Sequence, residues 1–319
     1  KHDYLRISLT ERCNLRCFYC MPEEGIQLRD KSHFMTSEEV IAIAKTFVEM
    51  GVKKIRLTGG EPLIKKDVAN VIKQLGELPV ELSITTNAVL VDKFIDVFKQ
   101  AGIKSINVSL DSLDESSFNQ ISRRNYFDKI KENIDLLIQN SFLVKVNVVV
   151  IRNVNEHEIP DFIRWTKNEN VHVRFIEFMP FDGNKWEWEK KISYQEIIEI
   201  TKQNFAESEF IRIKDKPNDT ARNYKLVNGK GTFGIISTVT NPFCDTCNRI
   251  RLTADGKIKN CLFSQSETDL LTAFRQGEDI EQLIRNAILD KKKERGGAGL
   301  FNNEIAKNLK NRSMISIGG

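Results

Sequence analysis

The chain has 319 residues, of which 40% are hydrophobic and 29% charged, and this ordinary globular balance argues against a disordered chain. Its length suits about two domains of ~150 residues each. The formal net charge is only +4 and no apolar run reaches the ~18 residues of a membrane span, so we expect neither a nucleic-acid partner nor a membrane partner, while a local basic pocket for a small anion stays open.

The first two-thirds of the chain alternates between strand-like and helix-like segments. Short alternating apolar runs predict strands at 5–9, 53–58, 80–84, 106–110, 143–151 and 171–176. Apolar residues at helical spacing predict a helix that begins at the capping box of Thr36 and Glu39 and ends at Gly51. The same spacing predicts further helices over 68–75, 94–101, 130–138 and 159–163. Six strand–helix units in series predict a parallel α/β sheet, either doubly wound or an open, partial barrel, with reactive groups beyond the carboxyl ends of the strands.

The pattern changes near residue 180. The remaining sequence mixes short strands, turns and a late helix at 280–294. We therefore divide the chain into a larger domain at 1–210 and a smaller one at 211–319.

Three cysteines occur within eight positions, in the stretch CNLRCFYC after the first predicted strand: Cys13, Cys17 and Cys20. Three thiolates from one loop suit an iron–sulfur cluster, whereas a structural zinc site needs a fourth ligand and a disulfide would leave an odd thiol. The polar neighbours in this loop make it a poor piece of core. The sequence favours a cluster with one iron open to a small molecule, and zinc is the main alternative.

A second set of three cysteines has the spacing C-x2-C-x13-C, at Cys244, Cys247 and Cys261. Two clusters would use all six cysteines, and zinc with a non-cysteine fourth ligand is the alternative here. Arg249 and Arg251 follow closely after Cys247, and in an extended segment their guanidinium groups point to one face. Such a pair suits a phosphate or a carboxylate. The alternative is that this segment is a solvated strand edge. The low cysteine content and the absence of a visible secretory signal predict a reducing, cytoplasmic location.

The motif C-x3-C-x-aromatic-C, with Tyr19 as the aromatic residue, resembles the signature of the radical S-adenosylmethionine enzymes. The TGGEP loop at 58–62 resembles the loop with which that family contacts S-adenosylmethionine. The resemblance implies a 4Fe–4S cluster on the first cysteine set, and a cofactor site that includes Tyr19, Gly60, Ser109 and Met179. Taken alone, Ser109 would be a plain strand-end hydroxyl and Met179 a core residue.

Further motifs narrow the resemblance to the GTP 3′,8-cyclase branch of that family. They are LRISLTERCNLRCFYCMP, VKKIRLTGGEPL, INVSLD, VKVNVVV, RFIEFMP, FC-x2-C-x-RIRL, Cys261 and the terminal Gly318-Gly319. The resemblance implies an α/β fold in which an open, partial (β/α)6 TIM-type barrel has its mouth closed by a smaller C-terminal α+β domain. It places a second 4Fe–4S cluster on Cys244, Cys247 and Cys261. It places GTP contacts on Arg6, Arg56, Thr85, Lys145, Arg249, Ile250 and Arg251.

The resemblance also implies an activity. GTP would be cyclised through a ribose radical to a 3′,8-cyclo-7,8-dihydro product, the first step of molybdenum cofactor biosynthesis. A cyclic pyranopterin monophosphate synthase would take the product, a flavodoxin or ferredoxin would supply electrons, and a homodimer is compatible with the sequence. One departure is Ala88, which stands where the family usually has glycine.

Two other functions remain open at this point. One is a radical enzyme that acts on a peptide or on another anionic small molecule. The other is a zinc-stabilised binding module, which is not an enzyme. Buried basic residues inside a barrel are costly unless an anion pairs with them, but the sequence does not show which strand face is inward.

Overall fold

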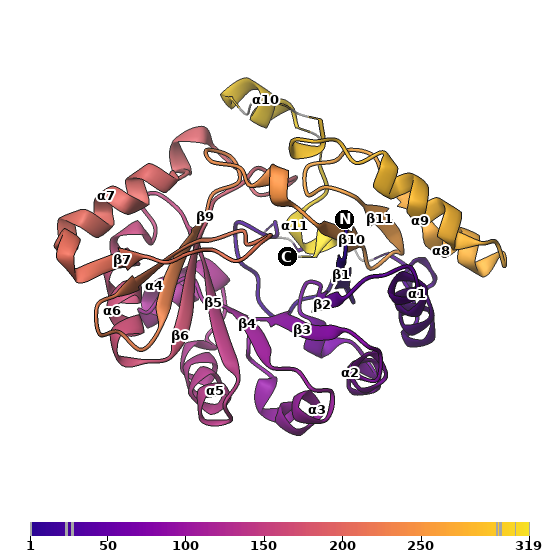
Figure 1. The fold of residues 1–319 in the computed structure, drawn as a ribbon, viewed down its shortest axis with the longest axis horizontal. Coiled ribbons are helices and arrows are strands. Elements are labelled where there is room, and N and C mark those ends of the chain that lie inside the picture. Colours follow the sequence, from indigo (N-terminus) through magenta and orange to yellow (C-terminus); the bar gives the residue numbers. More distant parts are fainter. Residues whose placement is uncertain are drawn as a thin grey trace.

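The computed structural model describes residues 2–22, 25–26, 29–297, 299, 302–309 and 311–318. Its first part is a run of six parallel strands joined by helices (Figure 1). The strands are β1 (Tyr4–Ser8), β2 (Lys54–Thr58), β3 (Glu81–Thr86), β4 (Ser105–Ser109), β5 (Leu143–Val150) and β6 (Val171–Glu177). The helices are α1 (Ser37–Glu49), α2 (Val68–Gly76), α3 (Ile95–Gln100), α4 (Glu115–Ser122), α5 (Phe127–Gln139) and α6 (Ile159–Asn168). The predicted open, partial barrel is confirmed.

The C-terminal part extends this sheet at both of its edges. β10 pairs in parallel with β1, and β9 pairs in parallel with β6. Antiparallel strands continue outward on each side, so β12 and β7 end the order and the sheet does not close. The strands are β7 (Phe210–Arg212), β8 (Arg222–Leu226), β9 (Thr232–Ile236), β10 (Arg249–Leu252), β11 (Lys257–Lys259) and β12 (Thr268–Asp269), and the helices are α7 (Tyr194–Asn204), α8 (Leu270–Arg275), α9 (Ile280–Leu289), α10 (Asn303–Asn308) and α11 (Met314–Ile317).

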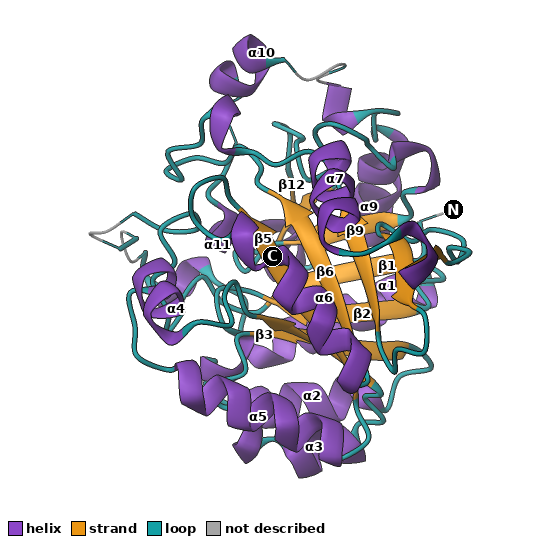
Figure 2. Cartoon of the chain, turned by 90° about the vertical axis from the view of Figure 1, so that its left-hand side faces the viewer, coloured by secondary structure: helices purple, strands orange, loops and turns teal. Residues whose placement is uncertain are grey.

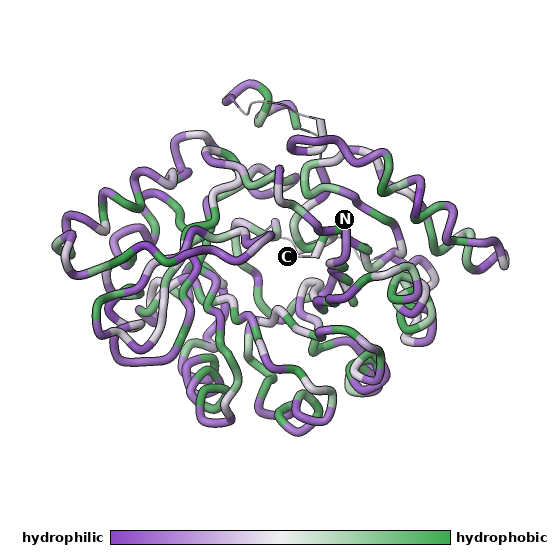
Figure 3. The backbone as a smooth tube through the Cα atoms, in the orientation of Figure 1, coloured by the Kyte–Doolittle hydropathy of each residue, from purple (hydrophilic) through white to green (hydrophobic). Residues whose placement is uncertain are grey.

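Helices cover the outer face of the curved sheet, as two perpendicular views show (Figures 1 and 2). Strand residues of one parity, such as Leu5, Ile7, Ile55 and Leu57, are fully buried against those helices. Hydrophobic and hydrophilic residues alternate along the helices at the rim (Figure 3), as expected when each helix buries one face. The strand residues of the other parity therefore face the inside of the barrel. In the described part of the chain, no helix is long and apolar enough to cross a membrane.

The predicted helices form, and several others were not predicted. The capping box of Thr36 and Glu39 is formed, with both reciprocal hydrogen bonds present. The late helix ends at Leu289, not at 294, because the charged residues after it offer nothing apolar to bury. The helices that were not predicted are α4, α7, α8, α10 and α11. For α7 a signal was available, because Ser193 and Glu196 form a second capping box.

Ala88 adopts the left-handed conformation that glycine adopts easily, with φ of 64°. Its methyl group is fully buried in the main apolar core. The departure from the family pattern therefore keeps the backbone shape expected of glycine and adds a small apolar contact.

Candidate active site

Three arginines lie side by side on the inner face where the two parts of the chain meet. Arg251 on β10 is in register with Arg6 on β1, and Arg6 is in register with Arg56 on β2. Arg56 and Arg251 are only 7% and 8% exposed. The strand pairing thus turns motifs nearly 250 residues apart in the sequence into one cationic row. The side chain of Ile250 points the other way, into the apolar core.

A second row runs across the neighbouring strands. Thr85, Asn107, Lys145 and His172 are successive register partners on β3 to β6. Asn107 donates to the hydroxyl of Thr85 at 3.3 Å. Two residues beyond His172, Arg174 is 9% exposed on the same strand face, and its Nε has no hydrogen-bond partner among the described residues. Arg174 was not predicted as a site residue.

The electrostatics of this face favour an anionic ligand. Burial lowers the pKa of Arg174 to about 9 and that of Arg251 to about 10, and nearby cations contribute to both shifts. Burial, Arg174 and Arg56 lower the pKa of Lys145 to about 8. Buried like charges repel each other, and an anionic ligand would relieve that repulsion. The inner face can therefore bind a polyanion.

The first cysteine set lies in the loop after β1. The amides of Cys20 and Met21 both donate to the carbonyl of Cys17 at 3.0 Å. Burial raises the pKa of Cys13 to about 11 and that of Cys20 to about 12, and the neighbouring cysteines and carboxylates contribute. These pKa values favour neutral thiols at neutral pH, and binding a cluster would require the loss of their protons.

The TGGEP loop packs directly on the cysteine loop. The amide of Gly60 donates to the carbonyl of Thr10 at 2.7 Å. The buried carboxylate of Glu61 accepts from the amides of Leu63 and Asn87, and from the hydroxyl of Thr86, at 2.7 to 3.0 Å. Burial nevertheless raises the pKa of Glu61 to about 7. The hydrogen bonds of Glu61 thus connect the loop that follows β2 to the end of β3.

Gly60→Ala is expected to disrupt this packing. An added Cβ would lie 2.2 Å from the carbonyl oxygen of Arg12, a backbone atom that cannot move aside. We expect a loss of about 1–3 kcal/mol in the free energy of unfolding, typical of overpacking, and a lower content of any iron that the first cysteine set binds. Chemical denaturation and iron content would measure both effects. Gly51→Ala is the control for backbone strain alone: its φ of 101° strains an alanine, but no atom lies within 4 Å of the added Cβ, so it should lose stability and keep its iron.

Of the other residues predicted to bind S-adenosylmethionine, Tyr19 lies in the cysteine loop itself, and Ser109 and Met179 lie at or just after strand ends. The hydroxyl of Tyr19 donates to Asp111, two residues beyond Ser109 at the end of β4. Met179 is buried in a small cluster that includes Ile317 of α11. A residue after β6 and the C-terminal segment therefore meet inside the barrel mouth.

The second cysteine set lies in the loop before β10 and the loop after β11. The amide of Cys247 donates to the carbonyl of Cys244 at 3.1 Å. Lys291 Nζ lies 3.5 Å from Cys247 Sγ and donates to the carbonyl of Arg249 at 2.8 Å. Burial favours the neutral thiol of Cys247, but Lys291 and Arg249 together lower its pKa. All six cysteines are free thiols.

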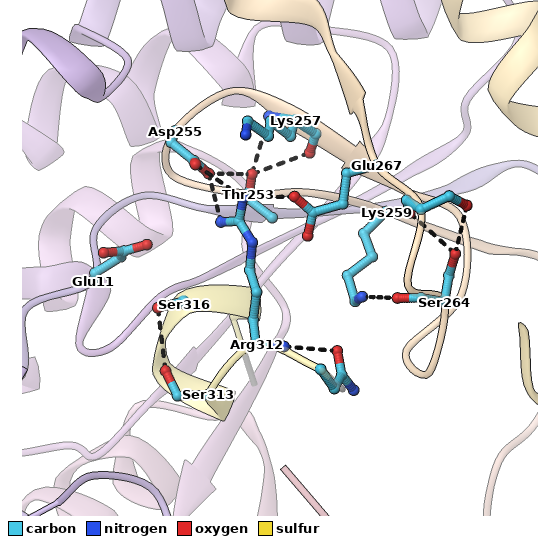
Figure 4. A network of polar contacts seen from close by, with 12 residues as sticks. Glu11, Thr253, Asp255, Lys257, Lys259, Ser264, Glu267, Arg312, Ser313 and Ser316 are labelled. Atoms are coloured by element: carbon cyan, nitrogen blue, oxygen red, sulfur yellow. Dashed lines mark hydrogen bonds and ion pairs between the residues drawn. The ribbon is translucent and has the colours of Figure 1, made fainter. Parts of the chain in front are cut away.

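The C-terminal segment enters the site and is held there by ion pairs. Arg251 donates to the carbonyl of Gly318 at 2.7 Å. Figure 4 shows Arg312 between the carboxylates of Asp255 and Glu267, which it contacts at 2.8 and 2.6 Å. Burial favours the neutral acid of Asp255, but Arg312 helps to lower its pKa well below the usual range. Gly319 lies outside the described residues.

The structure brings together most of the predicted site residues. The inner strand face carries the predicted cations, and both cysteine loops lie at the ends of strands in the same sheet. Among the described residues, no group of three or more His, Cys, Asp or Glu side chains is arranged to hold a single metal ion. The cluster ligands therefore stay predictions. Arg174, Lys291 and Arg312 were missed, although the alternation of VHVRFI gave a signal for Arg174.

Comparison with known proteins matches both parts of the chain. Residues 7–166 match the Radical SAM superfamily, and residues 171–296 match Molybdenum Cofactor Synthesis C. Molybdenum cofactor biosynthesis protein 1 of Drosophila melanogaster is 45% identical over 93% of this chain and 53% of the relative. GTP 3′,8-cyclase of Listeria monocytogenes is 38% identical over 100% of this chain and 97% of the relative. The chain thus spans about half the length of the first relative and nearly all of the second.

Among solved structures, Streptococcus suis SuiB bound to S-adenosylmethionine is similar, with a TM-score of 0.66. The identity is 14%, over 98% of this chain and 77% of that one, so this likeness shows the fold alone. The superfamily match supports S-adenosylmethionine and an iron–sulfur cluster as cofactors.

Proposed function

The chain belongs to the GTP 3′,8-cyclase family of radical S-adenosylmethionine proteins, and from this premise we propose that it converts GTP to (8S)-3′,8-cyclo-7,8-dihydroguanosine 5′-triphosphate. This reaction would be the first step of molybdenum cofactor biosynthesis. The observation that carries the proposal is the cationic row of Arg251, Arg6 and Arg56, in which Arg56 and Arg251 are buried and which joins the two parts of the chain. A triphosphate carries the negative charge that would balance this row of cations.

The substrate half of the site would hold GTP by its two ends. Arg6, Arg56 and Lys145 would pair with the triphosphate, with Thr85 beside them in the second row. Arg249 and Arg251 would lie nearer the second cysteine set, to which the resemblance assigns the guanine end. Because the side chain of Ile250 is in the apolar core, we propose that it contributes only main-chain groups.

The cofactor half would be built by loops that follow β1, β2, β4 and β6. The first cysteine set would hold one 4Fe–4S cluster, and Tyr19, Gly60, Ser109 and Met179 would surround S-adenosylmethionine. When bound, this pair supplies a 5′-deoxyadenosyl radical that can take a hydrogen atom from the ribose. The low exposure of the inner face would keep water away from the reacting sugar.

The second cysteine set would hold a second 4Fe–4S cluster with one iron left open for the substrate. We also propose a cytoplasmic location, a flavodoxin or ferredoxin as electron donor, and a cyclic pyranopterin monophosphate synthase as the enzyme that takes the product. A homodimer is part of the same proposal.

Iron and sulfide counts with a visible spectrum test the proposal. Anaerobically purified protein should contain about eight irons and eight sulfides per chain, and GTP should change its spectrum. It should then form deoxyadenosine and consume GTP when a reductant is supplied. Four irons without a response to GTP would remove GTP as the substrate. Zinc without iron would refute the radical reaction altogether.

GTP binding is expected to weaken as the pH rises above about 8. Burial and the cations around it lower the pKa of Lys145 to about 8, so above that pH the free site loses a charge that should pair with phosphate. The loss of one charge-assisted hydrogen bond corresponds to about tenfold in Kd. The stability of the ligand-free protein should instead increase as the pH rises. Between pH 8 and the ordinary lysine value of 10.5, the unfolded chain binds more protons, so this residue makes stability rise with pH.

Calorimetric titrations with GTP from pH 7 to 9.5 would measure this dependence. Lys145→Arg keeps a positive charge over that range and should flatten the profile. An unchanged profile in Lys145→Arg would assign the pH dependence to another group.

A further inference from the structure

Tyr4 occupies the centre of the cationic inner face and has no role in the function described so far. Its ring faces three cations: Lys54 Nζ lies 5.4 Å from the ring centroid, Arg56 Cζ 5.5 Å and Arg249 Cζ 5.7 Å. The negative face of an aromatic ring attracts cations at such distances. The ring therefore helps to hold like charges from β2 and β10 close together, with Tyr4 itself on β1.

The hydroxyl group of Tyr4 is buried without a hydrogen-bond partner among the described residues. The side chain is 8% exposed, so solvent does not compensate for the missing bond. The phenol also interacts electrostatically with Arg6, Arg174 and Arg251. Cations from four strands thus surround a polar group that lacks a partner.

An anion is the ligand that satisfies all of these groups together. A neutral phenol donates a hydrogen bond, and a phosphate oxygen accepts one, while the same phosphate pairs with the surrounding guanidinium groups. Burial favours the neutral phenol, although the cations around it lower the pKa of Tyr4. A bound phosphate would counteract those cations and keep the phenol protonated as a donor.

We propose that Tyr4 is a substrate-positioning residue whose hydroxyl donates a hydrogen bond to a phosphate of the bound triphosphate. This inference rests on the proposed function, because it needs a triphosphate in the cationic site. The ring and the hydroxyl have separate tasks: the ring assembles the cations, and the hydroxyl fixes one phosphate among them.

Tyr4→Phe tests the hydroxyl alone. We expect calorimetry on the reconstituted, anaerobic protein to show about tenfold weaker binding of both GTP and inorganic tripolyphosphate. The thermal midpoint of the ligand-free variant should be unchanged or higher, because the deleted group has no partner. Tyr4→Leu, which also removes the ring, should weaken binding further. Tyr126→Phe, at a tyrosine that is 38% exposed, is the matched control and should bind both ligands like the wild type.

Three results would overturn the inference. Equal Kd values for wild type and Tyr4→Phe would show that the hydroxyl makes no contact. Weaker binding of GTP with unchanged binding of tripolyphosphate would place the contact on the nucleoside. A lower thermal midpoint together with weaker binding would make Tyr4 a structural residue. If the wild type itself binds neither ligand, the proposed function fails first, and that outcome is distinct from the other three.

Discussion

Arg174→Met is expected to stabilise the ligand-free protein and, at the same time, to weaken GTP binding by about 10- to 100-fold. A hydrogen bond to a charged group contributes about 1.5–3 kcal/mol, which sets the size of the binding loss. The gain in stability should be about 1–3 kcal/mol, since methionine is close to arginine in length and carries no buried charge. Thermal unfolding without ligand and calorimetry with GTP would measure the two effects.

The opposite signs follow from the surroundings of Arg174. Its guanidinium is buried near Arg56 and its Nε lacks a hydrogen-bond partner among the described residues, so its charge is a cost until an anion arrives. Arg164→Met on the outer face of α6 is the matched control. That arginine is half-exposed and paired with Asp161 at 2.7 Å, so its loss should change stability by less than about 1 kcal/mol and leave binding unaltered. A variant of Arg174 that loses stability and binding together would contradict the argument.

The barrel could be predicted from the sequence because its signals are local. Alternation within KKIRLT gives the strand, and Thr36 with Glu39 gives the start of the helix that precedes it. Alternation also separates each strand into two faces. It does not say which face is inward, so Arg6 and Lys145 could be carried to the site only by resemblance.

The remaining features depend on contacts that are distant in the sequence. Nothing near Arg251 indicates that β10 pairs with β1, yet that pairing brings Arg251 beside Arg6. Likewise, nothing near Arg312 indicates that it pairs with Asp255, and that ion pair holds the C-terminal segment in the barrel mouth. Such pairings depend on tertiary packing and not on periodicity, which explains why Lys291 and Arg312 were missed. Arg174 had a signal in the alternation of its strand, but that alternation does not say which face is inward.

Removing one cysteine from either set, in two separate variants, is expected to abolish different steps of the reaction. Cys17→Ala should lose about four of eight irons and all deoxyadenosine formation, because two thiolates remain to hold the cofactor-binding cluster. Cys247→Ala should also lose about four irons, but it should still cleave S-adenosylmethionine with a strong reductant while failing to cyclise GTP. Alanine is preferred to serine, since a serine oxygen can replace a thiolate as an iron ligand.

Each variant serves as the control for the other, because both lose one thiol and the same amount of iron. Iron analysis, deoxyadenosine formation and GTP consumption would be measured on all three proteins under the same anaerobic conditions. Cyclisation at the wild-type rate by Cys247→Ala would refute a role for the second cluster. Loss of all iron from either variant would mean that the six cysteines form one interdependent site.

The two losses should be separable because different elements hold the two cysteine sets. The first loop is fixed to the end of α4, where the amides of Arg16 and Phe18 donate to the carbonyls of Ser122 and Ile121 at 2.9 and 3.1 Å. The second set is fixed instead by Lys291, which follows α9 and contacts Cys247. Neither set of contacts includes a cysteine of the other set. Removing Cys247 therefore leaves the support of the first loop intact, and the chemistry that depends only on that loop should survive.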